Sequence, residues 1–355
     1  KGILIPSLYH KLIVYDMIRT INIKQEQNMK VAELRNIISN YDKKTTDKVL
    51  VEIYKALPKS KKEDIDLLIL NPNDSTKKKS KIEKVDITNL ESEINYFIKC
   101  ANNDLYIAPN RIISKSERSK WRFKAMRFIK ELRLFDPKTE EGFTASKLLK
   151  ELYDLFSKAS HYYIFSSDNP FGSIKESQVS LACEIVDRLL INNKKDETIQ
   201  LCASIFNQPL DANTLSIEIV ANICALLYKH KVADEALHML IETCTRNKPN
   251  KGYSTSYEYD KREKYGVNVM AIAWLYTLTE EYEKGISFFK KNYPDKDEKY
   301  KENILLDQIL KYTAPEEIYI KEYEANEKLI KNSHLFEELT QTYNEFKKII
   351  KDTGH

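Results

Sequence analysis

Glycine is scarce in this chain, and its scarcity limits the folds that the chain can adopt. Only seven glycines occur among 355 residues, and two of them, Gly2 and Gly354, lie next to the chain ends. Tight β-hairpins and the phosphate-binding turns of doubly wound nucleotide folds both depend on glycine. Lysine, glutamate, leucine and isoleucine are abundant instead, and they suit helices. The composition therefore predicts an all-α protein.

Apolar residues recur at helical spacing along most of the chain, beginning with residues 31–41. From about residue 174 the predicted helices come in pairs, whereas those before it do not. We therefore predict a helical domain over residues 29–165 and a helical-repeat domain over residues 174–350. Residues 1–28 are expected to be an N-terminal extension, because a later methionine offers a candidate start.

The paired helices carry a repeated pattern around three short side chains, Thr198, Ala236 and Gly285. Each lies in the second helix of a predicted pair, where a short side chain allows two helices to cross closely. Larger residues stand at fixed offsets, four positions later and nine positions earlier: Cys202, Leu240 and Phe289, and Leu189, Leu227 and Tyr276. The offsets predict that each pair encloses its own small core.

Residues 175–295 resemble the tetratricopeptide-repeat superfamily, most closely at Val269–Tyr276, Glu281–Gly285 and Phe289. Two departures from the family pattern are Ala182, where the family prefers tryptophan, and Gly285, where it prefers alanine. HEAT-like or irregular helix pairs remain open alternatives. The resemblance implies antiparallel helix pairs stacked as a solenoid, whose concave face binds a peptide or protein.

Motifs that carry catalysis are missing from the sequence. It contains no phosphate-cradling GxxxxGK[ST], no GxGxxG, no HExxH and no GxSxG. The six histidines have no partner at metal-ligand spacing. We therefore expect no catalytic residues, no cofactor and no metal site. The chain is expected not to be an enzyme, and an enzyme with unrecognised residues is the third and least favoured class.

Cysteine usage and hydropathy indicate where the protein resides. The five cysteines are odd in number and form no CxxC pair, as expected of reduced core cysteines. No apolar run reaches the length of a transmembrane helix. We therefore expect a cytoplasmic protein with no membrane partner. The sequence does not indicate an oligomeric state.

The strongest charge anomaly lies in residues 111–133, which hold nine basic and two acidic residues. The local charge is +7, whereas the whole chain carries +4. Trp121 and Phe128 share one helix face that should dock into the core, whereas Phe123 points away from it among cations. An outward aromatic among cations is typical of nucleic-acid-binding surfaces. The residues of this candidate site are Lys115, Arg118, Lys120, Arg122, Phe123, Lys124, Arg127 and Lys130.

Two interpretations of the basic segment remain open. It either binds DNA or RNA, or it is a solvated amphipathic helix that pairs with acidic neighbours. A second candidate surface is the insertion 248–265, where Tyr253, Tyr257 and Tyr259 occur among small polar residues that suit recognition. The leading prediction is a non-enzymatic helical-repeat protein that binds a protein or peptide, and nucleic-acid binding through the basic segment is the alternative.

Overall fold

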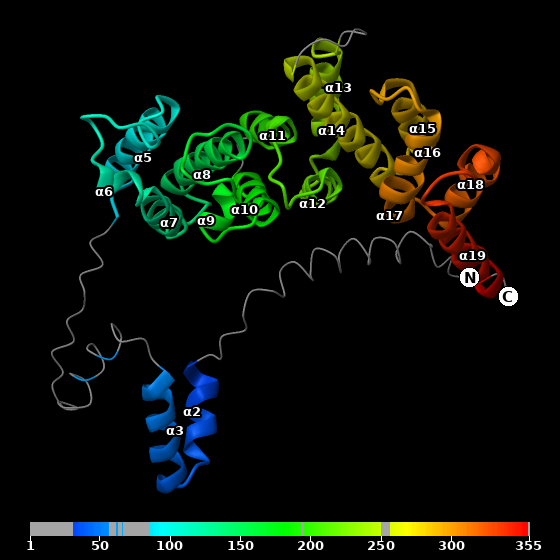
Figure 1. The fold of residues 1–355 in the computed structure, drawn as a ribbon. Helices are drawn as coiled ribbons and strands as arrows, with labels where there is room; N and C mark the ends of the chain where they lie inside the picture. The colour runs from blue at the N-terminus through cyan, green and yellow to red at the C-terminus, as the bar shows by residue number, and fades with distance from the viewer. Residues whose placement is uncertain are drawn as a thin grey trace. The chain divides into compact units, whose positions relative to one another are not determined.

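The computed structural model describes residues 31–56, 62, 66, 85–192, 195–249 and 256–353. These residues form helices and connecting turns, with no strand among them (Figure 1). The all-α prediction is therefore confirmed. The described residues divide into two compact units: those up to Asp86 form the smaller one, and those from Ile87 onward form the larger one.

The smaller unit contains helices α2 (Val31–Ser39) and α3 (Lys43–Ala56), joined by a short turn. The Asp42 carboxylate accepts a hydrogen bond from the backbone N–H of Thr45 at 3.0 Å, so an aspartate caps the start of α3.

The first part of the larger unit packs around an aromatic core. Its helices are α5 (Ile87–Asn102), α6 (Lys115–Arg118), α7 (Trp121–Leu132) and α8 (Glu140–Ala159), and both α5 and α7 pack on α8. The ring of Phe165 stacks on Trp121 with centroids 4.1 Å apart and also contacts Phe97 and Phe156. Phe165 follows α8, so the turn after this helix is fixed by its own aromatic side chain.

Three helix pairs follow in the order α10–α11, α12–α13 and α14–α15 (Figure 1). Helix α10 packs on α8 and on α12, and α12 packs on α14, so the first helices form a row. Helix α11 packs on α13, which makes a second row. The bounds are α10 (Gln178–Leu190), α11 (Lys195–Ser204), α12 (Ser216–Lys229), α13 (Ala233–Arg246), α14 (Ser256–Leu278) and α15 (Tyr282–Asn292).

Helix α10 packs on α8, although the sequence predicts a domain boundary between them, at residues 165–174. The larger unit therefore contains helices from both sides of that predicted boundary. Independent folding of residues 174–350 stays a prediction.

The short side chains of the repeated pattern lie at helix contacts. Thr198 and Ala236 are buried, and Thr198 donates a hydrogen bond to the carbonyl of Leu189, nine positions earlier. A Cβ added to Gly285 would lie 3.1 Å from the carbonyl oxygen of Ala273, and 3.1 Å from the Cβ of Tyr276, in α14. The predicted close crossing is therefore present in the α14–α15 pair.

The ends of α12 and α14 share one turn geometry. Lys231 and Glu280 adopt left-handed φ of 59° and 68°, and each lies five positions before its pair's short residue. The N–H of the next residue bonds the carbonyl five positions back, at Leu227 and Tyr276 respectively. This is the Schellman motif, which usually places glycine at the left-handed position. Lysine and glutamate occupy that position here, so the chain makes these turns without glycine.

The C-terminal helices pack against the last pair. Trp274 in α14 donates its indole N–H to the carbonyl of Gln308 at 3.1 Å, which ties α14 to a π-helical segment. Helix α18 packs on that segment and on α19. The remaining bounds are α9 (Pro170–Ser173), η1 (Ile205–Asn207), α16 (Glu298–Ile304), η2 (Leu305–Leu310), α17 (Lys311–Thr313), α18 (Glu316–Ile330) and α19 (Phe336–Thr353).

Candidate functional site

The basic segment forms two helices, α6 and α7, so the expectation of a single amphipathic helix is wrong. Ser114 caps α6, which ends after one turn, and the Arg118 guanidinium donates to the carbonyl of Ile113, before the cap, at 2.9 Å. Helix α7 begins at Trp121, whose ring is buried in the aromatic core. Burial of this ring fixes the start of α7, and Ser119 and Lys120 form the break.

Three of the arginines in this segment have partners within the protein. Arg118 bonds the backbone, as described above. Arg127 pairs with Glu93 of α5 and with Glu131. Arg133 pairs with two carboxylates after α8, Glu176 at 2.7 Å and Glu184 at 2.6 Å. Arg127 and Arg133 join α7 to its neighbours, and carboxylates compensate their charge.

The other cations of the predicted site face solvent. Lys115, Lys120, Arg122, Lys124 and Lys130 are all exposed, and none forms an ion pair with another described residue. Phe123 is 55% exposed, and the Arg122 guanidinium lies 4.8 Å from the centre of its ring. The interpretation that acidic neighbours pair with the whole segment therefore holds for Arg127 and Arg133 only.

A second candidate site is a groove in the larger unit, formed by two adjoining hollows. The first has a volume of about 580 Å³ and lies between residues 206–216, the first half of α14 and residues 293–300. The second has a volume of about 620 Å³ and is lined by α5, α8 and the same loop. The two hollows adjoin, because Gln208, Pro209 and Lys264 line both of them. We call the two adjoining hollows together the groove.

Buried hydrogen bonds hold the loop that forms the groove's floor. The amide of Gln178, fully buried in α10, donates to the carbonyl of Pro209 at 2.8 Å and accepts from the N–H of Asp211 at 2.7 Å. The opposite wall is fixed by Arg262, which donates to the carbonyl of Pro294 at 2.5 Å. The loop at the floor is bonded to α10, and the wall at Pro294 is bonded to α14. The groove is therefore already formed without a partner.

The groove is acidic although the chain is basic. It is lined by six carboxylates and three basic side chains: Glu151, Asp154, Asp211, Asp260, Glu263 and Asp295, and Lys158, Arg262 and Lys264. Burial and the neighbouring charges of Glu91 and Asp154 raise the pKa of Glu151 above its usual range. Lys150 pairs with Asp154 at 2.6 Å, so the charge of Asp154 is compensated within the protein, whereas Glu151 forms no ion pair with another described residue.

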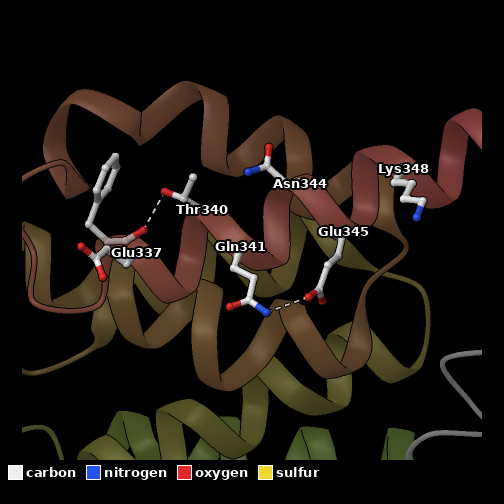
Figure 2. A pocket seen from close by; sticks show the side chains of 7 residues that line it. Glu337, Thr340, Gln341, Asn344, Glu345 and Lys348 are labelled. Atoms are coloured by element: carbon white, nitrogen blue, oxygen red, sulfur yellow. Dashed lines mark hydrogen bonds between the residues drawn. The ribbon is translucent and has the colours of Figure 1, made fainter.

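A third hollow, shown in Figure 2, is lined by seven side chains of α19, from Phe336 to Lys348. Several of them already bond one another, as Gln341 does with Glu345 at 2.9 Å. Because one helix supplies all of the described lining, this hollow has no second wall that could hold a ligand. It does not qualify as a candidate site.

The three tyrosines of the predicted partner-binding insertion are only partly placed. Tyr253 lies outside the described residues. Tyr257 and Tyr259 belong to the first turn of α14, but their side chains lie outside the described part. That turn leads directly into the groove wall, which begins at Asp260. The sequence analysis missed the groove itself, and the one local signal was Gln178, a polar residue among the apolar positions of α10.

Comparisons with protein-family models, curated proteins and solved structures found no match to this chain. Within the described ranges, no group of three or more His, Cys, Asp or Glu side chains is arranged to hold a metal ion. Among the helices that the structure describes, none combines the length and the apolar character needed to cross a membrane.

Proposed function

We propose that this chain is a non-enzymatic helical-repeat protein that binds a segment of a partner protein in the groove. The observation that carries the proposal is that two adjoining hollows extend over α5, α8 and α14, with sides held by hydrogen bonds. A preformed groove binds a segment with less loss of conformational entropy than a surface that must first become ordered.

A tetratricopeptide-like stacking of the helix pairs supports this proposal and is itself part of it. The first helices pack in a row from α10 to α14, and α11 packs on α13. Two of the pairs also repeat the same left-handed turn at the same register, at Lys231 and Glu280. Successive pairs of this kind build an extended binding surface from neighbouring repeats.

The chemistry of the groove favours a partner segment that carries lysine or arginine. Six carboxylates line the groove, of which Asp154 is paired with Lys150, and Tyr293, Tyr300 and Met270 add apolar lining. The proposed compartment is the cytoplasm, because the five cysteines are free thiols and four of them are buried.

The test is photocrosslinking from inside the groove. A benzoylphenylalanine placed at Val267, which is half-buried and lines the groove, should capture a protein segment in native lysate. The same probe at Ile286 in α15, also half-buried but outside the groove, is the control. A synthetic peptide of the captured segment should then bind the purified protein.

Two variants decide whether the peptide occupies the groove. Val267→Trp should fill the groove and weaken peptide binding at least about tenfold, which corresponds to about 1.4 kcal/mol. Ile286→Trp should leave the affinity unchanged. Equal affinities of the peptide for wild type and Val267→Trp would show that the groove is not the binding site.

A further inference from the structure

We propose that the exposed face of α6 and α7 is a second binding site, which takes single-stranded nucleic acid. We call it the basic surface and define it by Lys115, Lys120, Arg122, Phe123, Lys124 and Lys130. It shares no lining residue with the groove, so it does not depend on the function proposed above.

The positive charge of this surface has no ion-pair partner among the described residues. The arginines that stabilise the fold, Arg127 and Arg133, are paired with carboxylates from other helices. The cations of the basic surface have no such role, because they are exposed and form no ion pair with the described residues. Cations that the fold does not use are available to phosphates, and their binding releases counterions.

The cations are spread along the length of α7. Lys124 and Lys130 are exposed on this helix, and Lys120 is the exposed residue directly before it. With a rise of 1.5 Å per residue, Lys120 and Lys130 are about 15 Å apart along the axis. Cations spread over this length match several consecutive phosphates of one strand rather than a single anion.

The exposed ring of Phe123 favours the binding of single strands over duplexes. Its ring is 55% exposed and lies among these cations, with the Arg122 guanidinium 4.8 Å from its centre. Unpaired bases stack on such rings, whereas the bases of a duplex already stack on one another. An exposed aromatic contributes little to binding a duplex through its phosphates.

The burial of the apolar face of α7 argues against a membrane as the ligand. A helix that lies on a bilayer inserts its apolar face into the lipid. In α7 that face holds Trp121 and Phe128, which are buried against α5 and α8. The helix therefore offers lipids charge and one aromatic ring, which is too little apolar area for stable insertion.

The experiment measures fluorescence anisotropy of the purified full chain with labelled 20-nucleotide single strands of DNA and RNA, with the matching DNA duplex, and with vesicles containing phosphatidylserine. At low salt we expect binding to both single strands and weaker binding to the duplex. The affinity should fall with salt at a slope of about −3 to −4 on a log–log plot, as expected for five cations.

Two variants locate the site. Lys120→Glu/Arg122→Glu/Lys124→Glu should reduce single-strand affinity at least about 100-fold and flatten the salt slope by about 2. Phe123→Ala should weaken single-strand binding about five- to 100-fold and leave duplex binding nearly unchanged. The control reverses the three exposed lysines Lys328, Lys348 and Lys351 of α18 and α19, and should change affinity less than threefold.

The proposal is overturned if no single strand binds at low salt, if the duplex binds more tightly than either strand, or if vesicles bind and the strands do not. It is also overturned if the control triple variant loses as much affinity as the basic-surface variant. Circular dichroism of each variant shows whether it is folded. If the Lys120→Glu/Arg122→Glu/Lys124→Glu variant unfolds, the comparison of Phe123→Ala with Phe123→Trp tests the site instead. The alanine variant should lose single-strand binding, and the tryptophan variant should retain it.

Discussion

Replacing Gly285 should show how much the close crossing of α14 and α15 contributes to stability. A Cβ at this position would lie 3.1 Å from the carbonyl oxygen of Ala273 and 3.1 Å from the Cβ of Tyr276. It would also lie 3.3 Å from Cγ2 of Thr277. All three neighbours belong to α14, which also packs on α12 and η2, so the helix has little freedom to move away.

Two opposing effects set the magnitude. Glycine inside a helix is about 1 kcal/mol less favourable than alanine, so an open site would gain that amount from Gly285→Ala. Contacts of 3.1 Å with backbone and Cβ atoms offset this gain, and we expect the free energy of unfolding to change by less than about 0.5 kcal/mol. Gly285→Leu adds three more carbons to the same contact and should lower the free energy of unfolding by about 1–3 kcal/mol.

The assay is urea unfolding followed by circular dichroism and by tryptophan fluorescence, since Trp274 is buried next to Ala273. The control is Ser287→Leu, an exposed position in the same helix, which should change stability by less than about 0.5 kcal/mol. A gain of about 1 kcal/mol for Gly285→Ala, or a Gly285→Leu variant as stable as wild type, would refute the close crossing.

Two further changes test other features of the larger unit. Lys231→Gly should raise the free energy of unfolding by about 0.5–1 kcal/mol in urea titrations, because glycine relieves the left-handed φ of 59° at the end of α12, and a loss of stability would contradict this. Burial, opposed by the charge of Lys290, raises the pKa of Glu302 to about 7. Between pH 4.5 and 7 the folded protein therefore binds more protons at Glu302 than the unfolded protein does. The stability that comes from this proton binding is lost as the pH rises through that window. The free energy of unfolding of Glu302→Gln, relative to that of wild type, should therefore increase by about 1–3 kcal/mol from pH 5 to pH 8. An unchanged difference between the two proteins in urea titrations at these pH values would exclude the raised pKa of Glu302.

What the sequence determines here is local. Helical spacing of apolar residues is a property of short stretches. Together with the scarcity of glycine, it predicts the all-α class correctly. The offsets around Thr198, Ala236 and Gly285 also repeat within one helix pair, and these residues lie at the predicted contacts. The helical pattern fails at Ser119 and Lys120, between the end of α6 and the buried Trp121 that begins α7.

Only the tertiary structure decides which charges are free and where a groove forms. Arg133 and Glu184 lie 51 positions apart, so no local pattern distinguishes this paired arginine from Arg122, which forms no ion pair with the described residues. The groove joins residues from α5 to residues beyond α15, and its floor depends on Gln178 reaching Pro209. Periodicity reports which face of a helix is buried, whereas partners distant in the chain are fixed only when the helices pack together.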